Sequence, residues 1–339
     1  MSYAIPKGAR AYDVTGLGNA LVDALVRVEQ DGLLDEMELH RGHMHPVGHD
    51  QWNAAYQRVE SFGAELQSGG SCANTIAAMG LMGARSIYCG QVGDDGLGRL
   101  YAERLQEACG GHALRITSGH PTGKCLSIIS GADAERTMLS DLGAAIQLPD
   151  LGDFGATIQD SRMLHLTGYL LLGEPMRSRA LEAIAAAKEA GVPVSLDAAD
   201  PFVVETIGEL MWDTIQQSAD IVFLNAEEAA TLCGTSPEVA LEKVASVVDT
   251  VVVKLGGRGS MVSHRGSVVR AGVHKVDAID TTGAGDAYAA GFLYGLLHNW
   301  GPAESADLGS RVAAMTVSQI GAVVRDRSRL SSAISSAGA

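Results

Sequence analysis

Short apolar runs alternate with helix-like segments along most of the chain, and this alternation restricts the possible folds more than any other feature. The runs that read as strands, most of them ending near a glycine, are residues 12–18, 85–93, 161–168, 191–198, 219–225 and 250–257. Helix-like segments between them include residues 71–83, 174–191 and 286–299. Strands that are apolar nearly throughout are typical of a parallel sheet covered by helices on both faces. The sequence therefore predicts a three-layer α/β fold with a mostly parallel sheet.

Two regions, 22–66 and 112–146, depart from this rhythm and read as strands with one exposed face. The second contains a segment that reads as a hairpin turning around residues 131–133. We therefore expect a small β lid, formed by these two regions, inserted in a single domain that spans residues 1–330. The Ser/Ala/Gly-rich tail at 331–339 is expected to fray.

Charge and cysteine content exclude several classes of protein. Asp and Glu total 40 against 25 Lys and Arg, a net charge of −15, which argues against binding to a nucleic-acid backbone. The five cysteines are scattered and form no C-x-x-C pair, which favours a reduced, cytoplasmic protein. The first residues show no apolar leader, and no run is long enough to span a membrane, so no membrane partner is expected.

The segment DTTGAGDAYAAGF, residues 280–292, is the strongest candidate for a functional site. Its small residues let the backbone approach a ligand, and the N–H groups of Gly283, Ala284 and Gly285 would point outward where a helix begins. Such a helix start binds anions, because unpaired N–H donors and the helix dipole both favour negative charge. Asp286 would lie beside the anion and accept a proton from an attacking hydroxyl. The alternative is that Asp286 only caps the helix.

Two other strand ends carry weaker signals, and each has a plain structural alternative. Gly256, Gly257 and Gly259 follow an apolar strand, where they suit either a nucleotide contact or a hairpin turn. Asn225 ends another strand and Glu228 lies one helical turn later. That spacing suits a polar pair around a hydrated Mg²⁺ ion, or an ordinary helix start.

The first strand is followed by further polar residues. Asn19 and Asp23 would project from its end, either to hold sugar hydroxyls or to form a turn. Gly69 and Gly70 again precede a helix, with Asn74 in its first turn.

Common nucleotide-binding loops are missing. The stretch 119–125 has Cys125 where a P-loop requires Ser or Thr, and Leu21 breaks a G-x-G-x-x-G pattern after the first strand. A P-loop enzyme and a nicotinamide dehydrogenase are both disfavoured. Four histidines between His40 and His49 suggest zinc, but no cysteine partner or helical H-x-x-x-H frame accompanies them, so we do not predict a metal site there.

In their order along the chain, these stretches resemble the ribokinase-like (PfkB) family of small-molecule kinases. The resemblance runs from residue 14 to residue 322, and its most specific parts are the glycine-rich blocks at 69–106 and 280–296. It implies an anion hole formed by the amides of residues 283–285 with Asp286 as the catalytic base. The resemblance also implies residues that bind the substrate (Asn19, Asp23, Gly69, Gly70, Asn74) and the nucleotide (Asn225, Lys254, Gly256, Gly257, Gly259, Thr281, Thr282). It implies that Glu228 holds Mg²⁺ through water.

Within the family the chain resembles adenosine kinases more than ribokinases, in the stretches 18–23, 121–131, 196–205 and 220–234. Arg136 resembles the lid arginine that reaches the transferred phosphate. Adenosine kinases usually carry aromatic residues beside the base at the segment 167–173, where this chain offers only Tyr169.

The resemblance therefore implies an ATP- and Mg²⁺-dependent kinase that phosphorylates a primary hydroxyl of a nucleoside, with adenosine the first expectation. A sugar kinase that acts on ribose, fructose or a related sugar is the alternative, and a non-catalytic nucleoside- or sugar-binding regulator is less well supported. The expected partners are small molecules, and no nucleic acid is expected to bind. The protein is expected to be a monomer or a homodimer. Dependence on a monovalent cation stays open.

Overall fold

The computed structural model describes residues 3–6, 8–29, 32–42, 44–131 and 136–338. In this part of the chain the larger sheet has the strand order β14-β13-β12-β11-β10-β9-β1-β5-β6. Its strands are β1 (Val14–Leu17), β5 (Ser86–Gly93), β6 (Ala113–Thr117), β9 (Leu164–Thr167), β10 (Val194–Asp197), β11 (Ile221–Asn225), β12 (Thr250–Lys254), β13 (Ser260–His264) and β14 (Ser267–Ala271). All neighbours from β6 to β12 are parallel, and only β12–β13 and β13–β14 are antiparallel. The predicted mostly parallel sheet is confirmed.

Helices cover both faces of this sheet, as nearly continuous apolar strands require. One face packs against α3 (Ser71–Leu81), α4 (Gly96–Cys109), α10 (Ala284–Leu297), α11 (Pro302–Val317) and α12 (Arg327–Ala337). The other packs against α5 (Phe154–Gln159), α6 (Met176–Glu189), α7 (Pro201–Ser218), α8 (Ala226–Cys233) and α9 (Pro237–Ala245). Short 3₁₀ turns occur at Glu60–Phe62, Gly143–Ile146, Gly168–Leu171 and Gly256–Arg258.

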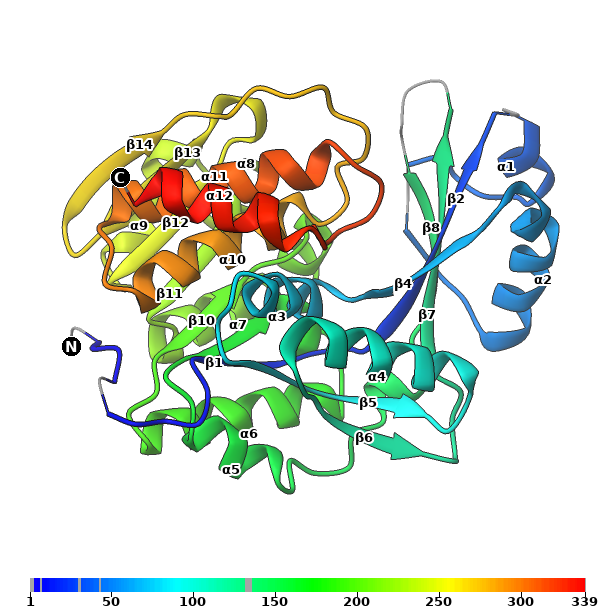
Figure 1. The fold of residues 1–339 in the computed structure, drawn as a ribbon, viewed down its shortest axis with the longest axis horizontal. Helices are drawn as coiled ribbons and strands as arrows, with labels where there is room; N and C mark the ends of the chain where they lie inside the picture. Colours follow the sequence, from blue (N-terminus) through cyan, green and yellow to red (C-terminus); the bar gives the residue numbers. More distant parts are fainter. Residues whose placement is uncertain (1–2, 7, 30–31, 43, 132–135, 339) are drawn as a thin grey trace.

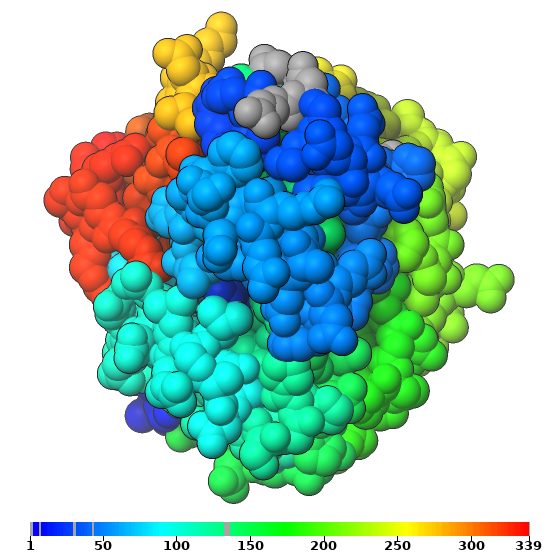
Figure 2. All heavy atoms as spheres, turned by 90° about the vertical axis from the view of Figure 1, so that its right-hand side faces the viewer, coloured from blue at the N-terminus to red at the C-terminus, as the bar shows by residue number. Residues whose placement is uncertain are grey.

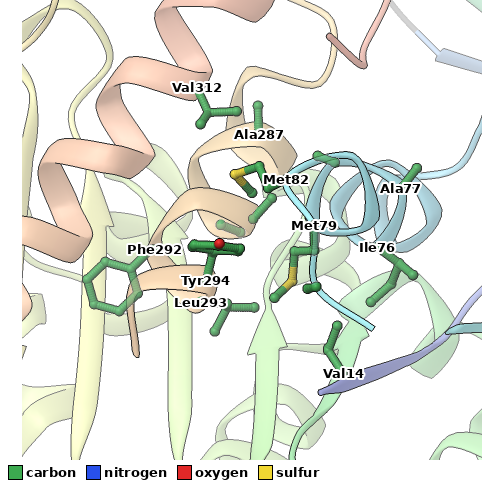
Figure 3. Close-up of a cluster of buried hydrophobic side chains, with 14 of the residues drawn as sticks. Val14, Ile76, Ala77, Met79, Met82, Ala287, Phe292, Leu293, Tyr294 and Val312 are labelled. Atoms are coloured by element: carbon green, nitrogen blue, oxygen red, sulfur yellow. The ribbon is translucent and has the colours of Figure 1, made fainter. Parts of the chain in front are cut away.

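Helices α3 and α10 pack closely, and this contact fixes the two glycine-rich blocks relative to each other. Met79 of α3 and Leu293 and Tyr294 of α10 belong to the same buried apolar cluster above Val14 of β1 (Figure 3). Because both helices begin at the same edge of the sheet, the packing brings residues 70–75 and 283–287 together.

A second, smaller sheet stands beside the body and has the strand order β3-β8-β7-β2-β4 (Figure 1). Its strands are β2 (Leu21–Val28), β3 (Met44–Pro46), β4 (Glu65–Gly69), β7 (Gly123–Ser130) and β8 (Arg136–Asp141). Helices α1 (Gly32–Glu36) and α2 (His49–Val59) lie on its outer side, which faces the viewer in Figure 2. We call this sheet with its two helices the lid.

The lid agrees with the sequence-based expectation in part. Strands β7 and β8 pair antiparallel, as expected for a hairpin, although residues 132 and 133 of the expected turn lie outside the described residues. The assignment of residues 113–117 to the lid is wrong, because they form β6, which pairs with β5 at the edge of the larger sheet. The region 22–66 also contributes helices as well as strands.

The expectation that residues 331–339 fray is wrong for the described residues. Helix α12 runs to Ala337, with Leu330, Ala333 and Ala337 buried. These residues recur at helical spacing and pack against the body, while Asp326 accepts hydrogen bonds from the Ser328 and Arg329 amides at the helix start. None of the helices described is long and apolar enough to cross a membrane.

Candidate active site

A cavity of about 1440 Å³ is lined by residues of the lid and of the carboxyl ends of the parallel strands. Ligands of open α/β sheets bind at this edge, because strand ends and helix starts meet there. The cavity is lined by these residues predicted from the sequence: Asn19, Asp23, Gly70, Asn74, Arg136, Asn225, Glu228, Lys254, Gly256, Gly257, Gly259, Thr281, Thr282, Gly283, Ala284, Gly285 and Asp286. Of the predicted set, Gly69 lies outside this lining.

Asp286 does not cap α10. The N-cap position is occupied by Gly283, and the Asp286 carboxylate turns towards α3 instead. Its Oδ1 accepts a hydrogen bond of 2.6 Å from Ser71 Oγ, and its Oδ2 accepts one of 2.9 Å from Asn74 Nδ2. Removal from water raises the pKa of Asp286 above its usual range, against the opposing effect of these two donors. The capping alternative is therefore wrong, and the arrangement suits a fixed carboxylate beside a reacting hydroxyl.

The loop before α10 is held by a buried carboxylate to which the sequence assigned no role. Asp280 Oδ1 accepts hydrogen bonds from the Thr282 amide and hydroxyl, and Asp280 Oδ2 accepts one from the Gly321 amide at 2.9 Å. Gly283 has φ of 70°, and a Cβ there would lie 2.5 Å from the Ala322 Cβ. The helix start can take this position only because residue 283 lacks a side chain.

Asp23 faces the cavity from the middle of β2 in the lid. Across the strand pair, a Cβ on Gly69 would lie 2.1 Å from Asp23 Oδ2, so Gly69 makes room for the carboxylate. Burial raises the pKa of Asp23 to about 7, Arg136 opposes the rise, and Asp286 and Asp280 add to it. A carboxyl in such a place is costly to ionise until it meets a hydrogen-bond donor such as a substrate hydroxyl.

Asn19 and Gly70 form the neighbouring wall. Gly70 has φ of 91°, and a Cβ there would lie 2.4 Å from the carbonyl oxygen of Asn19. The Asn19 Oδ1 atom is buried and has no hydrogen-bond partner among the described residues. It is available to accept a hydrogen bond from a ligand.

Arg136 connects the lid to the loop before α10. Its Nη1 donates a 2.7 Å hydrogen bond to Thr282 Oγ1, across the cavity from β8. The Ala284 amide donates to the Thr281 carbonyl oxygen. A cation beside the start of α10 adds to the positive potential of the helix dipole, which favours an anion.

Asn225 and Glu228 form a capping box at the start of α8, so their helix-start role is confirmed. Asn225 Oδ1 accepts from the amides of Glu227 and Glu228, and Glu228 Oε2 accepts from the Asn225 amide at 2.7 Å. Glu228 is only 1% exposed, and burial raises its pKa to about 7 while Lys254 opposes the rise. Both residues nevertheless line the cavity.

The glycines after β12 make the hairpin turn to β13 and also line the cavity. Gly256 and Gly259 have φ of 58° and 87°, and a Cβ on Gly259 would lie 2.0 Å from the Ala271 carbonyl oxygen. A Cβ on Gly257 would meet no atom within 4 Å, so its backbone is open to a ligand. Lys254, just before these glycines, forms an ion pair of 2.7 Å with Asp197.

The structure adds cavity residues that the sequence did not single out. Ser71 follows the predicted glycine pair, Asp197 ends β10, and Phe202 lies within the stretch 196–205. Asp197 could have been identified from the sequence, because it is a polar residue at the end of a predicted strand. Phe202 is 49% exposed and is an aromatic residue that lines the same cavity as Tyr169.

The lining of the cavity is divided here by the elements that supply it. The half towards the lid and β9, called the acceptor half, contains the apolar or aromatic residues Met44, Pro46, Met138, Leu142, Ile146, Tyr169, Leu172 and Phe202 and the polar residues Asn19, Asp23, Ser140, Glu174 and Asp200. The half towards β12 and β14, called the nucleotide half, contains Gly256, Gly257, residues 273–278, Ala313, Ala314 and Val317.

The histidines at 40–49 make other contacts in the described part of the lid. His45 Nε2 lies 3.1 Å from the His40 carbonyl oxygen, and His49 Nδ1 accepts a 2.8 Å hydrogen bond from Lys124 Nζ. His43 lies outside the described residues. No group of three or more metal-ligating side chains is found in the residues that the structure describes.

Comparison with known proteins identifies the family and the fold. Residues 45–327 match the family described as pfkB family carbohydrate kinase. The adenosine kinase structure from Sinorhizobium meliloti is 32% identical with a TM-score of 0.87, covering 96% of this chain and 99% of that one. A probable sugar kinase from Rhizobium etli CFN 42 is 27% identical with a TM-score of 0.89, covering 97% and 99%.

A curated relative points to a different acceptor. The 5-dehydro-2-deoxygluconokinase of Shouchella clausii is 29% identical over 281 residues, which are 79% of this chain and 85% of the relative. The family match covers most of the chain, and the relatives are kinases that share its fold and phosphorylate a hydroxyl group. This chain belongs to the pfkB family of carbohydrate kinases, and it is a phosphotransferase that acts on a sugar or nucleoside.

Proposed function

We propose that this protein transfers the γ-phosphate of ATP to the primary hydroxyl of a nucleoside, with adenosine as the preferred acceptor. The observation that carries the choice of acceptor is the apolar wall of the acceptor half, which Met44, Pro46 and Met138 line from the lid. Leu172 and Phe202 face it from the body. A purine ring buries well on such a wall, whereas a sugar acid has no flat apolar ring to bury there.

The polar groups of the acceptor half suit a ribose. Asp23 and the unpartnered Oδ1 of Asn19 are hydrogen-bond acceptors, and ribose hydroxyls are donors. A hydroxyl bound by these two residues satisfies buried acceptors that otherwise stay unpaired, so it contributes to affinity and fixes the ring. The similarity to the adenosine kinase of Sinorhizobium meliloti supports the same choice.

In the proposed mechanism Asp286 orients the attacking hydroxyl and accepts its proton. Ser71 and Asn74 hold the carboxylate through one hydrogen bond to each oxygen. Because its pKa is raised, Asp286 is a better base than an exposed aspartate. The amides of residues 283–285, together with Arg136, would offset the charge on the phosphoryl oxygens, which is the main contribution to phosphoryl transfer.

ATP fits the nucleotide half. The open backbone at Gly257 and the small apolar residues Ala313, Ala314 and Val317 allow a flat base to lie between the β12–β13 turn and α11. Its phosphates would then extend to the start of α10, where the helix dipole and the amides of residues 283–285 would provide the anion site once the Ala284 amide leaves the Thr281 carbonyl oxygen.

Mg²⁺ would be held by few protein groups. Mg²⁺ is usually bound by one or two carboxylates together with water and substrate phosphates, rather than by a protein cage. Glu228 fits that role, because a carboxylate has about four lone-pair sites and Asn225 occupies two of them in the described structure. When bound, the ion would neutralise phosphate charge.

We expect Mg²⁺ binding with nucleotide to weaken as the pH falls below about 7, where Glu228 takes up a proton. Glu228→Gln should weaken it by about 10- to 100-fold at pH 8, the usual effect of losing a group that orients a metal's bound water. Calorimetry of Mg²⁺ binding to the complex with a non-hydrolysable ATP analogue measures both the pH dependence of the affinity and the loss of affinity in the variant. The variant should retain only the pH dependence of the nucleotide itself, and a profile identical to that of the wild type would remove Glu228 from this role.

A panel of acceptors tests the proposed function. Burying roughly 100 Å² of purine surface at about 25 cal/mol per Å² contributes about 2.5 kcal/mol. That free energy corresponds to ~70-fold in kcat/KM, so adenosine should exceed ribose by about this factor. The panel includes other nucleosides, fructose and 5-dehydro-2-deoxygluconate, with ADP formation as the readout. A higher kcat/KM for any sugar than for every nucleoside would replace the nucleoside assignment with a sugar kinase.

A further inference from the structure

Lys254 lies in an electrostatically unfavourable place. A Cβ on Gly285, in the first turn of α10, would lie 3.1 Å from Lys254 Nζ, so the ammonium group lies against the start of that helix. The N-terminus of a helix carries about half a positive charge. The helix therefore repels the ammonium group, and some other group must hold it there.

Asp197 is that group. Its Oδ2 accepts a 2.7 Å hydrogen bond from Lys254 Nζ, and the two side chains are 4% and 15% exposed. Asp197 ends β10 and Lys254 ends β12, so the pair reaches across β11, where Lys254 Nζ lies 6.0 Å from the centre of the Phe223 ring. Burial lowers the pKa of Lys254, but the carboxylates of Asp197, Glu228 and Asp286 together raise it above its ordinary value. The side chain is therefore a cation at neutral pH.

We propose that Asp197 is a positioning residue that holds the Lys254 ammonium at the start of α10, where Lys254 contacts the transferred phosphoryl group. The inference rests on the proposed kinase function and adds a cation to its anion hole. The positive end of the α10 dipole and the ammonium repel each other until an anion arrives between them. A bound phosphate is therefore stabilised by both the helix start and the ammonium. The ion pair with Asp197 fixes the position of Lys254 before the phosphate binds.

A purely structural ion pair is the competing explanation, and a second contact allows a test. Asp197 Oδ1 accepts a 3.0 Å hydrogen bond from the amide of Ala199, a residue with φ of 79°. Asp197→Asn keeps an oxygen for this turn but removes the charge, whereas Asp197→Ala removes both. If Asp197 acts through its charge, the two variants should lose similar activity.

The experiment measures kcat and KM for ATP with the acceptor that the wild-type protein prefers. Lys254→Met should lower kcat by about 10²–10³-fold, as for loss of one donor to a developing anion. Asp197→Asn should lower it by about tenfold or more, and it should add no further loss to Lys254→Met, because the two residues act as one unit. Asp197→Asn should also lower the pKa of Lys254 and introduce a decline of kcat at alkaline pH.

Asp220→Asn is the matched control. Asp220 is a partly buried carboxylate that accepts a 2.8 Å hydrogen bond from the Val194 amide at the opposite end of the same strands, so its kinetics should match wild type. The inference is overturned if only Asp197→Ala is impaired, or if the Asp197→Asn and Lys254→Met losses multiply. Inactivity of the wild type towards every nucleoside, by contrast, refutes the nucleoside assignment and leaves this test to be run with the preferred sugar.

Discussion

Replacing Asp286 by Asn is expected to lower kcat by about 10²–10⁴-fold, the usual contribution of a general base. The substitution preserves shape but removes the only carboxylate that both Ser71 and Asn74 hold in the described structure. The KM for the acceptor should change little, because the substrate contacts proposed for Asn19 and Asp23 are untouched. Steady-state kinetics with the preferred acceptor measure both constants.

The pH profile provides a second readout of the same residue. Since the pKa of Asp286 is raised, kcat of the wild type should fall as the pH drops through that raised pKa and the carboxylate takes up a proton. The Asn variant should lack this acid limb. Asp213→Asn, at an exposed position on α7, is the control and should behave as wild type. A kcat within about tenfold of wild type for Asp286→Asn would show that Asp286 is not the base.

Replacing Asp141 by Ala is expected to destabilise the lid by about 3–5 kcal/mol, because it leaves a buried cation without its anion. Lys124 Nζ lies 3.2 Å from Asp141 Oδ2, with side chains that are 3% and 10% exposed. On the same side, Lys124 contacts His49 and lies 4.8 Å from the centre of the Trp52 ring. These two contacts tie β7 to α2 and remain after the substitution, but neither partner carries a full negative charge.

Hydrogen exchange resolves this effect by region. In Asp141→Ala the amides of β7 and β8 should exchange faster, whereas those of β11 in the larger sheet should keep their wild-type rates. The double variant Lys124→Met, Asp141→Leu should recover most of the lost stability, since an apolar pair needs no counter-charge. Unchanged exchange in β7 and β8 of the single variant would mean that the pair does not stabilise the lid.

Much of the architecture was predictable because it depends on local pattern. Apolar runs such as 219–225 and 250–257 correspond to β11 and β12, and the segment 71–83 corresponds to α3. Hydrophobic periodicity and glycine positions act over a few residues, so they are visible in the chain itself. The tail was missed because its serine-rich composition hides the buried stripe of Leu330, Ala333 and Ala337.

The candidate site was predictable to a similar extent. The glycine-rich blocks led to the residues that line the cavity, because small residues before a helix are needed wherever backbone amides face an anion. The apolar acceptor half was not predicted, since Met44, Met138 and Phe202 come from three distant segments with no shared pattern.

The sequence by itself determined the order of strands and helices and the types of residue at their ends. Only the tertiary structure decided which of those residues contact one another. Asp286 turns towards Ser71, which is 215 positions away, and Asp197 holds Lys254 across an intervening strand, 57 positions away. Such contacts depend on how helices pack on a twisted sheet and on which strands become neighbours. Those relations arise from burial of the whole core, and no short stretch of the chain contains them.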